Sequence, residues 1–185
     1  MICFKIRIEK DCSFMNNLFL FVKTIINKFF KEGMKVIMKV KDCMCDGVYS
    51  VKPDTQITEV AKIMGENHIG CVPVCDKNDA LCGIITDRDI ILRAVACKKD
   101  TCQTQASDIM TTNVCSCKQE DDMSAAQAKM SENQIRRLPV CDDNNHVVGM
   151  LSLGDLAQND SSLGKNEVAT TINRICDCNE NKNAE

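Results

Sequence analysis

The chain alternates between apolar residues at helical spacing and short, continuously apolar runs. A first helix is predicted by four apolar residues at positions i, i+3, i+4 and i+7, namely Ile57, Val60, Ala61 and Met64. Two apolar runs follow, residues 71–75 and 81–85, and the polar Asp-Lys-Asn-Asp link between them is typical of a hairpin turn. A second helical stripe comes after the hairpin and consists of Ile90, Ile91, Ala94 and Val95. With a β-prone segment at residues 48–51, the predicted order is strand, helix, strand, strand, helix.

The same plan occurs a second time, 66 residues later. Residues 42–89 align without a gap with residues 108–155, and sixteen of the forty-eight pairs are identical. The elements of the second copy are predicted at residues 114–117, 122–133, 137–141, 147–151 and 153–158. Because two copies are too few for a solenoid, we expect the pair to pack against each other. The predicted fold class is mixed α/β (α+β), with two tandem β-α-β-β-α repeats around a pseudo-two-fold axis.

The first 33 residues differ in composition from the rest of the chain. They contain all six Phe residues and carry a local charge of +3. Apolar residues between Phe14 and Phe30 recur at helical spacing, which predicts an amphipathic helix. The longest unbroken apolar run, residues 18–22, is too short for a membrane span, which needs about 20 residues. We favour a non-native extension, with the true start at Met34 or Met38; a helix that lies on a membrane surface or docks on a partner is the alternative.

Composition and charge narrow the class of protein. The predicted organisation is an extension at residues 1–33, one repeat at 41–100, a second repeat at 105–160, and a C-terminal helix or tail at 161–185. A net charge of −3 argues against general binding to nucleic acid, which requires a basic face. No Ser-His-Asp or Cys-His grouping recurs, and no G-x₄-G-K phosphate loop is present. We therefore expect a protein that is not an enzyme.

A short motif closes the hairpin of each repeat. It consists of Gly, two apolar residues, Thr or Ser, two variable residues and Asp, at residues 83–89 and 149–155. Each motif follows a strand with the sequence Pro-Val-Cys-Asp, at residues 73–76 and 139–142. Because both parts occur twice at the same offset, the chain resembles the cystathionine-β-synthase (CBS) domain family in its usual tandem form. The resemblance extends from Lys41 to about Gln158.

The residues of this motif suit an adenine nucleotide. A hydroxyl at a strand end lies beside a helix N-terminus, which favours phosphate, and a carboxylate can accept both hydrogen bonds of a ribose diol. In the family, the Asp holds ribose and the Ser or Thr reaches phosphate. The resemblance therefore implies one site with Thr86 and Asp89 and a second with Ser152 and Asp155. An alternative interpretation makes these residues helix caps without a ligand.

The resemblance also implies which residues line the two sites. The backbone before each Pro-containing strand would contact the adenine, with apolar walls at residues 69–72 and 135–138, which include Ile69, Cys71, Val72 and Leu138. The basic residues that fall near the clefts, and are candidates for phosphate binding, are His68, Arg136 and Arg137. The family often has a basic residue where this chain has Gln134, so one site differs from the usual phosphate contacts. His68 as a helix cap and the two arginines as a solvated or dimer-facing pair are the alternatives.

Fourteen cysteines suggest a second hypothesis. Three C-x-C pairs occur, at residues 43–45, 115–117 and 176–178, but structural zinc sites favour C-x₂₋₄-C spacing, so no metal site is predicted. Cysteines on the apolar strands are expected to behave as small buried hydrophobes. A redox or metal sensor built from the C-x-C pairs is the alternative function.

The sequence thus favours a stand-alone regulatory module. We expect it to bind an adenosine-containing ligand such as AMP, ADP or ATP, to form a homodimer as the family does, and to be cytoplasmic. Ligand binding would act on an unidentified regulated protein by changing the populations of two arrangements of the repeats. A membrane contact is expected only if the N-terminal segment is genuine.

Overall fold

The computed structural model describes residues 38–159 and 167–176. The chain divides into two units, Met1–Val36 and Ile37–Glu185, and every element described belongs to the second unit. The amphipathic helix predicted within residues 1–33 lies outside the described residues. Inside the described ranges, each helix is too short or too polar to cross a membrane.

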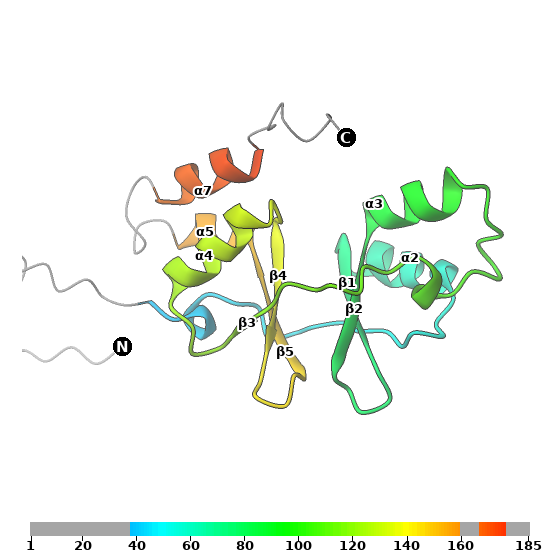
Figure 1. Ribbon diagram of the computed structural model, residues 1–185, viewed down its shortest axis with the longest axis horizontal. Coiled ribbons are helices and arrows are strands. Elements are labelled where there is room, and N and C mark those ends of the chain that lie inside the picture. Colours follow the sequence, from blue (N-terminus) through cyan, green and yellow to red (C-terminus); the bar gives the residue numbers. More distant parts are fainter. Residues whose placement is uncertain (1–37, 160–166, 177–185) are drawn as a thin grey trace, which may run out of the picture. The chain divides into compact units, whose positions relative to one another are not determined.

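The first repeat consists of a helix followed by a hairpin (Figure 1). Helix α2 (Ile57–Glu66) turns one apolar face to the core, where it buries Ile57, Val60 and Met64. Ala61, predicted in the same stripe, is exposed. Strand β1 (Cys71–Cys75) is buried throughout and pairs antiparallel with β2 (Leu81–Thr86). The predicted helix and hairpin are therefore present.

A second helical segment closes this repeat. It begins as α3 (Asp87–Asp89) and continues as η2 (Ile90–Val95), in which the Ala96 N–H donates to the carbonyl of Ile91 at 2.8 Å, the wider spacing of a π-helix. Ala94 is buried in the core. The prediction of a core stripe was wrong for Ile91 and Val95, which are exposed together with Leu92 because no described element packs on this side of η2.

The second repeat adds a strand to the same plan. Strand β3 (Cys117–Lys118) pairs parallel with β4 (Arg137–Cys141), which pairs antiparallel with β5 (Val147–Ser152). Helix α4 (Met123–Glu132) precedes the hairpin and α5 (Leu153–Gln158) follows it. Mixed α and β structure in two copies is the predicted fold class, and the structure confirms it.

The first strand of each repeat is shorter than predicted. The segment at residues 48–51 is reduced to a single parallel bridge between Val51 and Val74. In the second repeat, only Cys117 and Lys118 of this region are paired. Val48 and Tyr49 in the first repeat, and Val114 and Cys115 in the second, line two cavities between the repeats.

The segments that lead into the two repeats are exchanged. Two short 3₁₀ helices mark them, η1 (Val40–Asp42) and η3 (Ala106–Asp108). Val40 is fully buried in the core of the second repeat, and its N–H donates to the carbonyl of Asp121 at 3.0 Å. Ala106 is fully buried in the core of the first repeat, and its N–H donates to the carbonyl of Thr55 at 2.8 Å. Each core is thus completed by a segment that precedes the other repeat, including Val40, which lies before the predicted boundary at residue 41.

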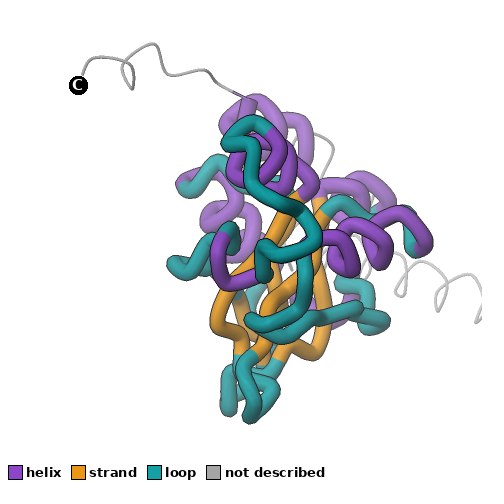
Figure 2. Tube along the Cα trace, turned by 90° about the vertical axis from the view of Figure 1, so that its right-hand side faces the viewer, coloured by secondary structure: helices purple, strands orange, loops and turns teal. Residues whose placement is uncertain are grey.

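The two hairpins meet at their turns, and both turns lie at the same end of the strands (Figures 1 and 2). Asp76 and Asp142, identical in the Pro-Val-Cys-Asp motif, build these turns, since the Oδ1 of each accepts two backbone N–H groups at 2.8–3.0 Å. An antiparallel bridge joins Ala80 to His146. Because these two residues are 66 positions apart, the pseudo-two-fold axis passes between them.

A C-terminal helix covers the second repeat. Helix α7 (Glu167–Cys176) packs on α4 and α5. Val168 and Ile175 are buried in the second core, whereas Ile172 is 37% exposed.

Candidate functional site

Two cavities lie between the repeats. The first, cleft 1, has a volume of about 400 Å³ and contains Thr86 and Asp89. The second, cleft 2, has a volume of about 380 Å³ and contains Ser152 and Asp155. Both volumes fall in the range of small-molecule sites.

Each cleft is assembled from both repeats. In cleft 1 the end of β2 faces residues 133–137, the turn between α4 and β4. In cleft 2 the end of β5 faces residues 67–71, the turn between α2 and β1. Every residue that lines cleft 2 has its counterpart, 66 positions away, in the lining of cleft 1. The duplication therefore produces two matched cavities.

The Thr86 hydroxyl and the Asp89 carboxylate of cleft 1 are hydrogen-bonded to each other. Thr86 Oγ1 donates to Asp89 Oδ2 at 2.7 Å, and the Thr86 backbone N–H donates to the same oxygen at 2.8 Å. The Asp89 N–H in turn donates to Thr86 Oγ1 at 3.2 Å. This is a capping box at the start of α3, the alternative that the sequence left open.

Cleft 2 contains the same hydrogen-bonded unit. Ser152 Oγ donates to Asp155 Oδ2 at 2.6 Å, the Ser152 N–H donates to it at 2.7 Å, and the Asp155 N–H donates to Ser152 Oγ at 3.3 Å. One oxygen of each carboxylate is therefore committed to the helix cap. The other oxygen, Oδ1, takes no part in the cap, so capping and ligand binding are compatible.

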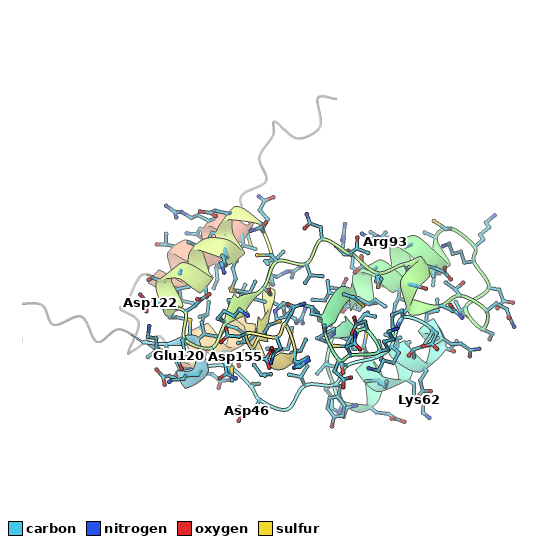
Figure 3. The ribbon with its side chains drawn as sticks, turned by 60° about the horizontal axis from the view of Figure 1, so that its bottom comes forward. Asp46, Lys62, Arg93, Glu120, Asp122 and Asp155 are labelled. Atoms are coloured by element: carbon cyan, nitrogen blue, oxygen red, sulfur yellow. The ribbon has the colours of Figure 1, made fainter. Side chains whose placement is uncertain are left out.

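The neighbour of Oδ1 differs between the clefts. In cleft 1 the Arg93 guanidinium lies 3.4 Å from Asp89 Oδ1 and also donates to Thr111 Oγ1 at 3.1 Å. In cleft 2 the Cys45 thiol donates to Asp155 Oδ1 at 3.4 Å. This hydrogen bond and the nearby negative charge raise the pKa of Cys45 above its usual value. Figure 3 labels Arg93 and Asp155, which lie in different repeats.

The predicted apolar walls are present in part. Ile69 lines cleft 2, Ile135 lines cleft 1, and Cys71 lines both. Val72 and Leu138 line neither cavity, because alternate residues of a strand point to opposite sides and these two are fully buried in the two cores. Burial also raises the pKa of the Cys71 thiol to about 11, so this thiol stays neutral.

The basic residues are divided unequally. His68 lines cleft 2, Arg136 lines cleft 1, and Arg137 lines both. In the part of the chain that the structure describes, neither arginine is within 4.0 Å of a carboxylate. Arg88, which the sequence argument missed, adds a third guanidinium to cleft 1.

A further group of lining residues was also missed. They belong to the lead-in segments: Cys45, Gly47, Val48 and Tyr49 in cleft 2, and Thr111, Asn113, Val114 and Cys115 in cleft 1. Val48 and Val114 are an identical pair in the repeat alignment, a signal that could have found them. Because the sequence analysis assigned residues 48–51 and 114–117 to strands, it did not consider Val48 and Val114 as cleft residues.

Two of the three C-x-C pairs are split between the core and the clefts; in the third, Cys176 is exposed and Cys178 lies outside the described residues. Cys43 and Cys117 are buried, whereas their partners Cys45 and Cys115 line the clefts. Burial raises the pKa of Cys117 to about 12. Across residues 38–159 and 167–176, no three His, Cys, Asp or Glu side chains are grouped so that they could hold a metal ion.

Comparison with known sequences identifies the family. The CBS domain family matches residues 40–95 and 106–161. The chain belongs to this family and contains two of its domains in tandem. A relative, the CBS domain-containing protein YhcV of Bacillus subtilis (strain 168), is 42% identical over 123 residues, which are 66% of this chain and 86% of that protein. An inosine-5'-monophosphate dehydrogenase of Methanocaldococcus jannaschii is 31% identical over 66% of this chain but only 24% of the enzyme.

Solved structures of CBS pairs share the fold. The CBS domain pair of protein MJ0100, in complex with 5'-methylthioadenosine and S-adenosyl-L-methionine, has a TM-score of 0.62 and 30% identity over 69% of this chain and 99% of that chain. CBSX2 in complex with AMP has a TM-score of 0.59 and 25% identity over 68% and 97%. Hypoxic Response Protein I, with two coordinated zinc ions, has a TM-score of 0.61 and 28% identity over 66% and 99%.

Proposed function

We propose that this protein is a regulatory module that binds an adenosine-containing ligand in each of the two clefts. The single observation that carries the proposal is the hydroxyl–carboxylate unit repeated in two matched cavities, with one carboxylate oxygen of each committed to the helix cap. Oδ1 of Asp89 or Asp155 accepts the hydrogen bonds of a ribose diol. The complexes of related CBS pairs with AMP and with adenosine sulfur compounds support this ligand class.

The clefts have the other properties that such a ligand requires. Apolar side chains, including Ile69 in cleft 2 and Ile135 in cleft 1, offer surfaces for a flat base. Because the Thr86 and Ser152 hydroxyls already donate to the carboxylates, the guanidinium groups of Arg136 and Arg137 are better placed than these hydroxyls to meet phosphate charge. We assign no catalytic step to either cleft.

A thermal-unfolding series tests the proposal. The full chain is heated under reducing conditions with adenosine, AMP, ATP or S-adenosylmethionine, and guanosine serves as the control nucleoside. A ligand at about 100 times its dissociation constant stabilises the native state by about 2.7 kcal/mol for each independent site. No shift with any adenosine compound, in a protein that unfolds cooperatively, overturns the proposal.

Ligand binding would regulate by favouring one arrangement of the two repeats, since each cleft includes residues from both. We also propose a homodimer, consistent with three large apolar side chains exposed on one turn of η2: Ile91, Leu92 and Val95. Sedimentation equilibrium measures the mass. A monomer at micromolar concentration would contradict the dimer without affecting the ligand proposal.

A cysteine-based sensor is the second candidate function, since a related CBS pair coordinates two zinc ions. Its test replaces Cys43, Cys45, Cys115 and Cys117 by Ser. If the unaltered chain binds stoichiometric zinc and the variant does not, the sensor displaces the nucleotide proposal. If adenosine-ligand binding survives in the variant and no zinc is bound by either, the sensor is rejected.

A further inference from the structure

The two clefts differ most at the positions where a phosphate would lie. Three guanidinium groups line cleft 1, those of Arg88, Arg136 and Arg137. The residues 66 positions away from them are Gly154, Gly70 and Cys71, none of which carries a charge at neutral pH. Duplication therefore left a cationic cluster in one cleft and small neutral residues at the matching positions of the other.

The acidic groups of the linings do not cancel this difference. Cleft 1 contains Asp87 and Asp89 beside its three arginines, and Asp89 is already paired with Arg93 outside the lining. Cleft 2 contains one arginine, Arg137, and one carboxylate, Asp155. Cleft 1 thus has a net positive lining, whereas in cleft 2 one arginine balances one carboxylate.

The remaining lining of cleft 2 is aromatic and sulfur-containing. Tyr49, the only tyrosine in the chain, is 52% exposed and lines this cleft, where cleft 1 has Cys115. Met150 and Cys45 replace Ile84 and Thr111. An aromatic ring and polarizable sulfur atoms favour a flat, uncharged ligand over a multiply charged one.

We propose that the two clefts select different adenosine ligands: cleft 1 takes an adenosine polyphosphate, and cleft 2 takes an adenosine whose 5' substituent carries no negative charge. This inference rests on the proposed function. Arg88 and Arg136 are the specificity-determining residues, because they line cleft 1 alone, whereas Arg137 contributes to both clefts.

Two single-cleft variants test the selection by isothermal titration calorimetry, with magnesium-free ATP and adenosine as probes. Asp155→Asn leaves cleft 1 as the intact site, and Asp89→Asn leaves cleft 2. The Asn carbonyl still accepts the backbone N–H of the cap, so we expect both variants to fold, and circular dichroism checks this. In Asp155→Asn we expect ATP to bind at least about tenfold more tightly than adenosine; in Asp89→Asn we expect the order to reverse.

A third substitution identifies the selective group. Arg136→Gly, made in the Asp155→Asn chain, gives cleft 1 the residue that cleft 2 has at position 70. We expect ATP affinity to fall about tenfold, the loss of one charge-assisted hydrogen bond, with adenosine affinity unchanged. Raising the salt concentration should weaken ATP binding in cleft 1 and leave adenosine binding in cleft 2 unaltered.

The possible failures are distinguishable. If neither probe binds to the unaltered chain, the proposed function itself fails. If both probes bind but the ratio of their affinities is the same in the two single-cleft variants, or does not change in Arg136→Gly, the selection is wrong while the adenosine sites stand.

Discussion

Cleft 1 and cleft 2 are built from matched residues but differ in the group that contacts the carboxylate oxygen Oδ1 of Asp89 or Asp155. Asp89 faces the Arg93 guanidinium at 3.4 Å, and Asp155 faces the Cys45 thiol at the same distance. The partners come from different places, since Arg93 lies one helical turn after Asp89, whereas Cys45 belongs to the exchanged lead-in segment. The partner of Asp89 Oδ1 therefore comes from the same repeat, whereas the partner of Asp155 Oδ1 comes from a segment that is distant in the sequence.

This difference shows which residues the duplication has kept. The identical pairs include Asp89 and Asp155 in the caps and Asp76 and Asp142 in the turns. Among the pairs that line the cavities, some have diverged, such as Arg136 and Gly70, and others are identical, such as Val48 and Val114. The caps and turns account for the identity of the Asp pairs, and the proposed difference in ligand would account for the divergence of Arg136 and Gly70.

The glycines of strands β2 and β5, Gly83 and Gly149, give the largest expected effect. A Cβ on Gly149 would lie 2.6 Å from Met44 Sδ and 3.1 Å from the carbonyl oxygen of Cys45, which already accepts the Met150 N–H at 2.9 Å. A Cβ on Gly83 would meet the Met110 side chain alone among its three nearest atoms. We expect Gly149→Ala to destabilise the fold by about 1–3 kcal/mol, and Gly83→Ala by less, because the three nearest atoms at Gly83 belong to one methionine side chain, whereas at Gly149 the bridged backbone must also shift.

Urea unfolding of the two glycine variants measures this difference. Gly65→Ala is the matched control, because nothing lies within 4 Å of a Cβ at this exposed position of α2. It should be neutral or stabilise the protein by up to about 1 kcal/mol. Equal losses in Gly83→Ala and Gly149→Ala would mean that the backbone carbonyl of Cys45 yields as easily as a side chain.

Local elements could be predicted from the sequence because their signals are local. Helix α5 and strand β4 have the predicted bounds, since a capping hydroxyl starts the one and polar residues flank the other. The exchange of Val40 and Ala106 between the cores could not be predicted, because equivalent residues fit equivalent cores and the alignment does not say which copy each one enters. The exposed face of η2 was missed because an apolar pattern does not show whether another element covers it.

For the candidate site, the sequence predicted which motif residues lie together, while their roles toward a ligand stay predictions. Four residues, Thr86, Asp89, Ser152 and Asp155, come together in two clefts as proposed from the motif. What the motif could not supply was the part of each lining that comes from the lead-in segments, such as Cys45 and Thr111, because these residues reach the clefts only through tertiary packing.

Removal of Arg93 should have a smaller effect than the glycine substitutions. Its guanidinium donates to the carbonyl of Ile109 at 2.7 Å and pairs with Asp89, but the side chain is half exposed. We expect Arg93→Met to lower stability by about 1 kcal/mol, and the loss to shrink as salt screens the ion pair. Asn159→Ala is the counterpart in the second repeat, where Asn159 donates to the carbonyl of Asp155 at 2.9 Å. The effect of Asn159→Ala on stability should not depend on salt. If the effect of Arg93→Met does not depend on salt either, the Arg93 ion pair contributes nothing measurable.

The smallest expected effect is chemical, and it concerns the thiol of cleft 2. Cys45 donates to Asp155 Oδ1, and this hydrogen bond, followed by the negative charge of the carboxylate, raises the pKa of the thiol above its usual value. Because the folded-state pKa is the higher one, the hydrogen bond stabilises the fold below the pKa of an unfolded cysteine, near 8.5, and this contribution disappears as the pH rises through the folded value. At neutral pH, Cys45 should therefore react more slowly with iodoacetamide than an unfolded cysteine does, although it is exposed.

Peptide mass spectrometry measures the alkylation rate of Cys45 as a function of pH. We expect the midpoint of the profile to lie above that of the same cysteine in urea, and Asp155→Asn to lower it, because the amide carries no charge. The matched substitution in cleft 1, Asp89→Asn, should leave the profile unchanged, since no thiol was found bonded to that carboxylate among the described residues. If Asp155→Asn leaves the midpoint where it was, the thiol does not bond to this carboxylate in solution. Asp155 Oδ1 would then have no partner in the ligand-free protein, and the two clefts would not differ through an arginine and a cysteine that occupy equivalent carboxylate oxygens.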